Sequence, residues 1–233
     1  MSSHANPNGE EHLAVQFEGR AQQDESYLVG MWAFLATEVM FFGALFVCYA
    51  VYRMRAPQVF VAGHHFLSVP MGTINTAILL TSSLTMACAV HFAQRGRKSP
   101  QIILMMVTMF LAICFLGIKG VEYSAKFREH LVPGIHFVWE PGNLPGSSSS
   151  TSNEPPVTRD QAQMFFSLYF ALTGLHALHI IIGVFIMGTL TLMLMGNHSA
   201  TRYFMPVEMT GLYWHFVDIV WIFLYPLLYL IPS

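Results

Sequence analysis

The sequence predicts an all-α membrane protein, a polytopic bundle of five transmembrane helices. Two observations lead to this fold class. Of the 233 residues, 54% are hydrophobic and only 10% are charged, whereas soluble domains carry roughly 25% charged residues. The apolar residues also fall in long runs, and a helix of about 20 apolar residues crosses the hydrocarbon core of a bilayer. Backbone groups in hydrocarbon must be hydrogen-bonded within their own segment, so runs of this length are predicted to be helices.

Five runs are long enough and poor enough in charge to be spans. They are expected at about residues 27–52, 71–92, 101–120, 164–195 and 211–231. Together they make one membrane domain, residues 27–231, preceded by a polar leader, residues 1–26, without the apolar segment of a secretory signal. Residues 131–160 are rich in Pro, Gly and Ser and are predicted to form an external linker between the third and fourth spans.

Basic residues indicate how the bundle is oriented. Arg95, Arg97 and Lys98 lie in the short turn between the second and third spans, and short basic loops favour the cytoplasmic side. The expected topology therefore has a cytoplasmic amino terminus. Because five is an odd number of spans, the carboxy terminus is expected on the opposite side of the membrane.

Charge and cysteine content exclude two classes of partner. A formal net charge of −2 offers no positive field for a phosphate backbone, so nucleic acid is not an expected partner. Cys48, Cys88 and Cys114 lie in three different apolar runs, where each is interpreted as a small hydrophobic residue. No cysteine-bound metal is expected.

Ionisable residues within the spans are the candidate functional residues, because they are costly in hydrocarbon. Glu38 lies near the middle of the first span, with no basic residue within two helical turns. A hydrogen bond to another helix and a role in proton or lipid binding both remain open for Glu38.

Two histidines lie one turn apart on the fourth span. His176 and His179, at i and i+3, share a helix face and are therefore able to hold one metal ion. A di-iron bundle needs Glu-x-x-His motifs, which the chain lacks, and two stacked haems need histidine pairs at two depths. Interhelical hydrogen bonds are therefore predicted for both histidines, and no metal site is predicted.

The fifth span carries His215 and Asp218, also one turn apart. A buried Asp beside a His can share a proton or pair charges, so the two are predicted to satisfy each other. Trp214 is expected near a membrane interface, where its ring N–H stays in contact with water.

The second and third spans carry candidate contact residues. Asn75, Ser82 and Ser83 belong to a face of small, weakly polar residues that is expected to pack on protein rather than on lipid. Glu122 and Tyr123 follow Lys119, whose amine is expected either to pair with Glu122 or to extend to the interface.

Lipid contacts are expected at the membrane surface. His91, Arg95 and Arg97 are placed to meet phospholipid headgroups, although a solvated basic turn is an equal alternative. Trp32 and Trp214 are the further candidates for lipid contact.

Five segments, taken in order, resemble subunit III of the haem–copper respiratory oxidases, the family of cytochrome c oxidase subunit III and its quinol-oxidase counterpart. They are Trp32–Phe42 with Glu38, Asn75–Ser83, Ile118–Tyr123, Phe170–Gly183 and Tyr213–Pro226. The resemblance extends over residues 27–231 and is strongest in the last two segments.

The resemblance implies a non-catalytic subunit in a bacterial inner membrane that itself binds no haem or copper. Its implied partners are phospholipid, catalytic subunit I, which carries haem and copper, subunit II, and a small subunit IV or a larger respiratory supercomplex. The implied role is to sustain proton uptake and the stability of subunit I. Glu38 matches the membrane carboxylate of the family, and five later residues match family motif positions: Glu122, His176, His179, His215 and Asp218.

One departure from the long family form concerns the lipid cleft. That form has seven helices, with the cleft between the first two and the other five, and this chain resembles the shorter form that begins at the third. A two-sided lipid cleft is therefore not expected within this chain.

Two other functions are compatible with five apolar spans. A membrane dihaem cytochrome b that oxidises quinol would use the histidines, and a proton-coupled transporter would use Glu38 and Asp218 as coupling carboxylates. Against a transporter, neither of these two spans has the Gly or Pro interruption of a broken helix near its carboxylate, and no pseudo-symmetric halves are visible.

Overall fold

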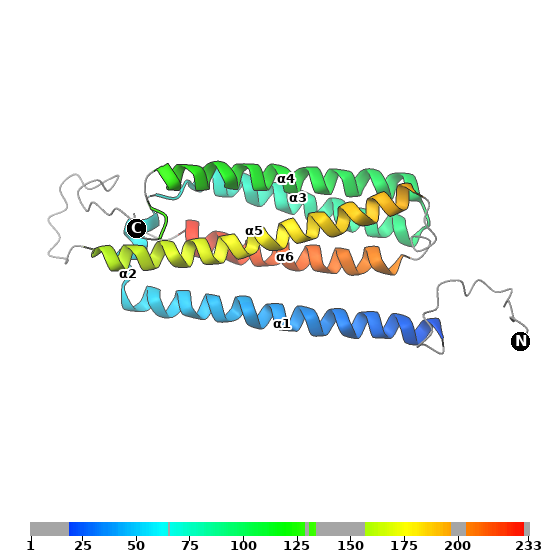
Figure 1. Cartoon of the computed structure of the whole chain (residues 1–233), viewed down its shortest axis with the longest axis horizontal. Helices are drawn as coiled ribbons and strands as arrows, with labels where there is room; N and C mark the ends of the chain where they lie inside the picture. Colours follow the sequence, from blue (N-terminus) through cyan, green and yellow to red (C-terminus); the bar gives the residue numbers. More distant parts are fainter. Residues whose placement is uncertain (1–18, 65, 129–130, 134–156, 197–203, 231–233) are drawn as a thin grey trace, which may run out of the picture.

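The computed structural model describes residues 19–64, 66–128, 131–133, 157–196 and 204–230. These residues form six α-helices (Figure 1): α1 (Arg20–Arg55), α2 (Pro57–His64), α3 (Val69–Gln94), α4 (Lys98–Arg128), α5 (Arg159–Met195) and α6 (Met205–Tyr229). All but α2 are long and apolar enough to cross a membrane, by length and composition. The predicted all-α bundle with five membrane-spanning helices is confirmed.

The helices extend beyond the predicted spans. The first begins at Arg20, inside the predicted leader, and α4 continues to Arg128, beyond the predicted end at residue 120. A count of apolar residues measures only the hydrocarbon core, whereas a helix continues into the headgroup region. Residues 1–18 of the leader and 134–156 of the linker lie outside the described residues. The short helix α2 was not predicted.

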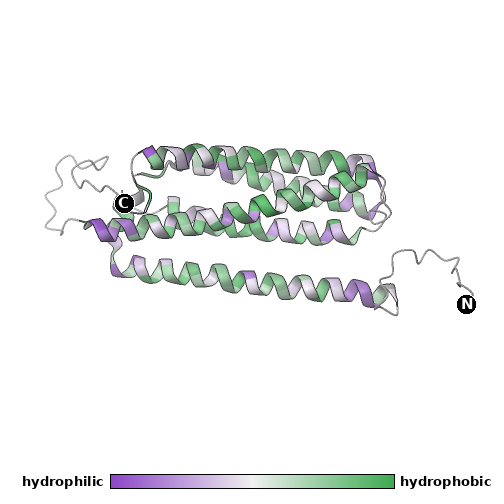
Figure 2. Ribbon diagram, viewed as in Figure 1, coloured by the Kyte–Doolittle hydropathy of each residue, from purple (hydrophilic) through white to green (hydrophobic). Residues whose placement is uncertain are grey.

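Four helices form the central bundle. Helix α3 packs against α4 and α6, and α5 packs against the same two helices. Helix α1 runs beside this bundle and contacts mainly α6, whereas α2 packs against α5 at the end of the bundle where α1 finishes (Figure 1). Polar residues gather at the helix ends and apolar residues in the middle, as expected for helices in a bilayer (Figure 2).

Helix α1 meets the bundle along one narrow face. Leu35, Phe42 and Tyr49 are buried at intervals of seven residues, which is the repeat of a coiled-coil seam. Glu38 lies on the same seam, between Leu35 and Phe42. On other faces of α1, large apolar side chains such as Met40 are exposed, with 75% of the Met40 surface accessible.

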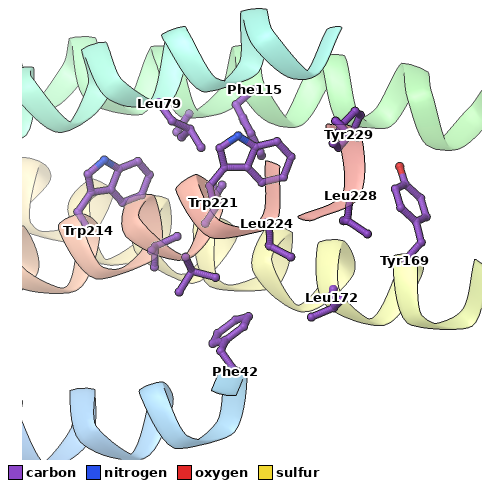
Figure 3. Packing of buried hydrophobic residues seen from close by; sticks show 14 of the residues in the cluster. Phe42, Leu79, Phe115, Tyr169, Leu172, Trp214, Trp221, Leu224, Leu228 and Tyr229 are labelled. Atoms are coloured by element: carbon purple, nitrogen blue, oxygen red, sulfur yellow. The ribbon is translucent and has the colours of Figure 1, made fainter. Parts of the chain in front are cut away.

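Helix α6 carries the centre of the core. The side chains of Trp214 and Trp221 are completely or almost completely buried among residues of neighbouring helices (Figure 3). A Cβ atom at Gly183 of α5 would lie 2.8 Å from the Trp214 ring, and one at Gly211 of α6 would lie 2.8 Å from Val90 of α3. Glycines at these two positions therefore allow α5 and α3 to approach α6 closely.

Candidate functional site

Glu38 and His179 meet across the contact between α1 and α5. His179 Nε2 and Glu38 Oε2 lie 3.1 Å apart, and His179 Nδ1 lies 2.8 Å from the Leu175 carbonyl oxygen. Because a carbonyl oxygen only accepts, Nδ1 carries a proton. The predicted interhelical hydrogen bond is therefore present for these two residues.

Aromatic rings surround this pair. The Phe42 ring lies edge-on to the His179 imidazole at a centroid distance of 5.2 Å, and the Tyr213 ring stacks beside it at 6.5 Å. The Tyr213 hydroxyl donates to the His179 carbonyl oxygen at 3.0 Å. The His179 and Glu38 side chains keep 12% and 19% of their surface exposed, so the pair is not sealed inside the chain.

A ladder of polar contacts joins α3 to α6. Ser83 meets His215 Nδ1 at 2.7 Å, and the Trp214 and Trp221 ring N–H groups donate to Ser82 and Thr76 at 2.9 and 3.1 Å. Asn75 and Ser82 are completely buried. The small, weakly polar face of α3 thus packs on protein.

Two predictions for α6 are wrong. The first is that the Trp214 ring N–H stays in contact with water: the ring is buried and its N–H donates to Ser82, because α6 lies between α3 and α5. The second is the pair of His215 and Asp218. His215 bonds to Ser83 instead, and neither Asp218 oxygen has a hydrogen-bond partner among the described residues. The hydroxyl of Ser83 on α3 therefore provides the hydrogen-bond partner of His215 that Asp218 was predicted to provide.

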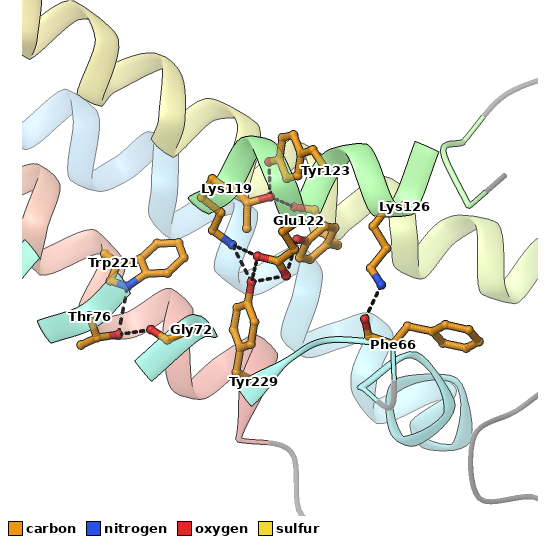
Figure 4. Close-up of polar contacts among 11 residues, drawn as sticks. Phe66, Gly72, Thr76, Lys119, Glu122, Tyr123, Lys126, Trp221 and Tyr229 are labelled. Atoms are coloured by element: carbon orange, nitrogen blue, oxygen red, sulfur yellow. Dashed lines mark hydrogen bonds and ion pairs between the residues drawn. The ribbon is translucent and has the colours of Figure 1, made fainter. Parts of the chain in front are cut away.

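A buried ionic cluster lies near the end of the bundle where α6 finishes (Figure 4). Lys119 Nζ lies 2.9 Å from Glu122 Oε2, and each side chain is only 4% exposed. The hydroxyls of Tyr169 and Tyr229 donate to Glu122 Oε1 at 3.0 and 2.7 Å. Of the two alternatives for Lys119, the structure therefore has the ion pair. The cluster ties together α4, α5 and α6.

Next to this cluster, the Tyr123 hydroxyl meets the Thr173 hydroxyl at 2.6 Å, which adds a second polar link between α4 and α5. Tyr169 and Tyr229 were not among the predicted site residues. In the sequence, a tyrosine within an apolar helix looks like an ordinary packing residue. The acceptor of both hydroxyls, Glu122, lies on a different helix, so the contact could not be predicted from the local sequence.

His176 does not make the predicted interhelical hydrogen bond. Its side chain is 1% exposed, and its ring lies 5.1 Å from the Trp221 ring and 5.7 Å from the Phe115 ring, measured between centroids. Neither ring nitrogen has a hydrogen-bond partner among the described residues. Residues three apart on a helix differ by about 60° in direction, so His179 meets α1 while His176 lies inside the four-helix bundle.

The predicted lipid-contact residues, apart from Trp214, lie at the surface. His91, Arg95 and Arg97 are exposed around the turn between α3 and α4, where Gly96 adopts a left-handed conformation with φ of 69°. Trp32 is 63% exposed on α1. Within the part of the chain that the structure describes, no group of three His, Cys, Asp or Glu side chains is close enough to hold a metal ion.

Comparison with known proteins gives the family. A sequence model of the family "Cytochrome c oxidase subunit III" matches residues 14–129 and 156–233. Quinol oxidase subunit 3 of Bacillus subtilis (strain 168) is 28% identical over 229 residues, which is 98% of this chain and 96% of the relative. Cytochrome c oxidase subunit 3 of Branchiostoma lanceolatum is 29% identical over 208 residues, which is 86% of this chain and 67% of the relative.

A third relative is much longer than this chain. Heme-copper oxidase subunit I+III of Aeropyrum pernix is 30% identical over 207 residues, which is 86% of this chain but only 22% of the relative. The family match includes all five membrane-spanning helices, and with them the Glu38–His179 pair and the ionic cluster around Glu122. The chain therefore belongs to the cytochrome c oxidase subunit III family of the haem–copper oxidases.

Proposed function

We propose that this subunit III binds phospholipid, stabilises the catalytic subunit I of a proton-pumping oxidase and supports its proton uptake, without carrying out redox chemistry itself. One observation carries the proposal. The ionisable side chains in these two groups of residues are hydrogen-bonded to protein partners: Glu38 of α1 meets His179 of α5, and Glu122 of α4 meets Lys119 on its own helix, Tyr169 of α5 and Tyr229 of α6. Such contacts hold a helical scaffold together and leave these groups unavailable as metal ligands.

Subunit I is the direct partner in this proposal. A relative named as subunit I+III supports an association of the two subunits. Subunit II, a small subunit IV and a larger supercomplex are further proposed partners. The proposed location is a bacterial inner membrane, with the amino terminus in the cytoplasm and the carboxy terminus in the periplasm.

The proposed lipid contact rests on the turn between α3 and α4. His91, Arg95 and Arg97 expose their side chains at one end of the bundle, where headgroup phosphates lie in a membrane. Trp32 exposes an amphipathic ring on α1, and such rings favour the interface.

Mass spectrometry of the intact oxidase in mild detergent tests the lipid contact. We expect the double variant Arg95→Gln, Arg97→Gln to carry less anionic phospholipid than the wild type. The matched control is Arg55→Gln. Arg55 is exposed at the last residue of α1, at the opposite end of the bundle from the turn between α3 and α4 (Figure 1). Equal lipid in the double variant and the wild type would contradict the proposed lipid site.

The role in sustaining subunit I is tested by removing subunit III. Oxidase purified from a strain without this chain is expected to consume oxygen at first and to lose activity faster during turnover than the complete enzyme. Identical activity over time would contradict the proposed role.

The oxidase interpretation is favoured over both alternatives. His176 and His179 have different neighbours on different sides of α5, which does not suit a haem pair. Helix α1 runs unbroken through Glu38, and α6 does so through Asp218, which does not suit the broken helices of a transporter. An absorption spectrum of the isolated chain with reduced b-haem bands would restore the cytochrome interpretation.

A further inference from the structure

Three polar side chains in the four-helix bundle have no hydrogen-bond partner among the described residues. Asn75, His176 and Asp218 are 0%, 1% and 3% exposed, and both polar atoms of each side chain are unpaired. Buried polar groups in native proteins are nearly always hydrogen-bonded. Leaving six such atoms unpaired would cost about as much free energy as the whole net stability of a domain. A ligand within the bundle must therefore satisfy them.

The three side chains lie close to one level of the bundle. Helices α3 and α6 are antiparallel, and the bonds from Trp221 to Thr76 and from Trp214 to Ser82 fix their register. This register puts Asn75 level with Trp221, and Asp218 is one turn away on α6. His176 of α5 contacts the Trp221 ring at a centroid distance of 5.1 Å. All three therefore lie within about one helical turn, roughly 5 Å along the bundle axis, of Trp221.

Neighbouring polar groups already have partners. Ser83 lies close to Asp218 without meeting the geometry of a hydrogen bond, and its hydroxyl is engaged by His215 at 2.7 Å. Lys119 is engaged by Glu122 and by the Tyr229 hydroxyl. Both groups are hydrogen-bonded elsewhere, and neither meets the geometry of a hydrogen bond to any of the three side chains.

The chemistry of the three groups identifies the ligand. The Asn75 amide offers a donor and an acceptor, an imidazole that holds one proton offers one of each, and the Asp218 carboxyl group chiefly accepts. A cation would leave the donors of Asn75 and His176 unpaired and an anion would leave their acceptors unpaired, whereas water both donates and accepts.

We propose that the α3–α6 bundle encloses bound water that hydrogen-bonds to Asn75, His176 and Asp218. A buried water makes about three hydrogen bonds, so roughly three waters satisfy these groups and each other. This inference rests on the geometry of the bundle and is independent of the proposed function of the subunit.

Electron cryo-microscopy of the purified oxidase, at a resolution that shows ordered water, tests the proposal. We expect density for a water within hydrogen-bond distance of each of the three side chains. A dry interior would overturn the proposal, as would direct hydrogen bonds from these side chains to each other or to other protein atoms.

Variants at Asp218 show whether the carboxyl group holds the water. Asp218→Val is expected to lose the water at this position while Asn75 and His176 keep theirs. The matched control is Ile180→Val in the same core, which is expected to keep every water. Unchanged water density in Asp218→Val would overturn the assignment. Asp218→Asn keeps the polar atoms and is the second variant if the valine variant fails to assemble; loss of its water would also count against the proposal.

Discussion

Glu38 illustrates how a carboxyl group is accommodated inside a membrane helix. It lies on the seam of α1 that faces the bundle, and His179 of α5 supplies a hydrogen bond at 3.1 Å. Glu38 therefore contributes to the docking of α1 on the bundle.

The first prediction concerns the charge at this position. Glu38→Lys puts an ammonium beside His179 on a buried seam and is expected to cost about 3 kcal/mol, because a Lys near the helix centre is expensive. Glu38→Gln keeps a side chain that donates to Nε2 and is expected to cost less than about 1 kcal/mol. The amount of subunit III per subunit I in purified oxidase measures both effects. Equal amounts in the Lys variant and the wild type would contradict a Glu38 side chain that packs against the bundle.

The second prediction concerns the tyrosine hydroxyl in the ionic cluster. Tyr229→Phe removes hydrogen bonds to Glu122 and Lys119 and is expected to cost about 1–2 kcal/mol. The matched control is Tyr225→Phe, where a single bond to Thr73 is lost. Thermal unfolding of subunit III in the purified oxidase is expected at a midpoint roughly 2–8 °C lower for Tyr229→Phe. A larger shift for Tyr225→Phe would contradict the importance of the cluster.

At the scale of helices, the sequence predicts which segments form membrane-spanning helices, but few of the side-chain contacts between those helices. The length and apolarity of each run predict five spans, because these are local properties of the chain. Partners such as His179 for Glu38 and Ser83 for His215 come from other helices, so their pairing depends on helix rotation and register, which span lengths leave open. For the same reason the predicted pair of His215 and Asp218 was wrong.

The third prediction tests the close approach of α5 and α6. Gly183→Ala adds a Cβ atom 2.8 Å from the Trp214 ring and is expected to destabilise the subunit by about 1–3 kcal/mol, because overpacking forces helices apart. Gly117→Ala is the matched control, since nothing lies within 4 Å of a Cβ atom there. The same thermal midpoint measures both variants, and an equal midpoint for the two would argue against tight packing at Gly183.

At the scale of the whole molecule, the chain divides into a four-helix bundle and a helix attached to its side. Helices α3 to α6 supply most of the buried core, to which α1 adds Phe42 and Tyr49 and α2 adds Val59 and Phe60. Helix α1 is also held by a few polar contacts, such as that of the Tyr49 hydroxyl with the Leu227 carbonyl oxygen. Many apolar residues of α1 remain exposed. This surface suits lipid or another membrane helix.

The fourth prediction concerns topology. Five spans put the two termini on opposite sides of the membrane, and the basic turn between α3 and α4 favours a cytoplasmic amino terminus. Alkaline phosphatase fused to the carboxy terminus is expected to be active, and the same enzyme fused to the amino terminus is expected to be inactive. Activity in both fusions would contradict an odd number of spans.

The central claim is that this chain is a subunit of a haem–copper oxidase and holds no redox centre of its own. Affinity purification through a tag on this chain, followed by haem and metal analysis of the complex and of the separated polypeptide, tests it most directly. The predicted result is haem and copper with oxygen-consuming activity in the complex and none on the separated chain. Stoichiometric iron or copper on the separated chain, or a chain that never purifies with an oxygen-consuming core, would contradict the claim.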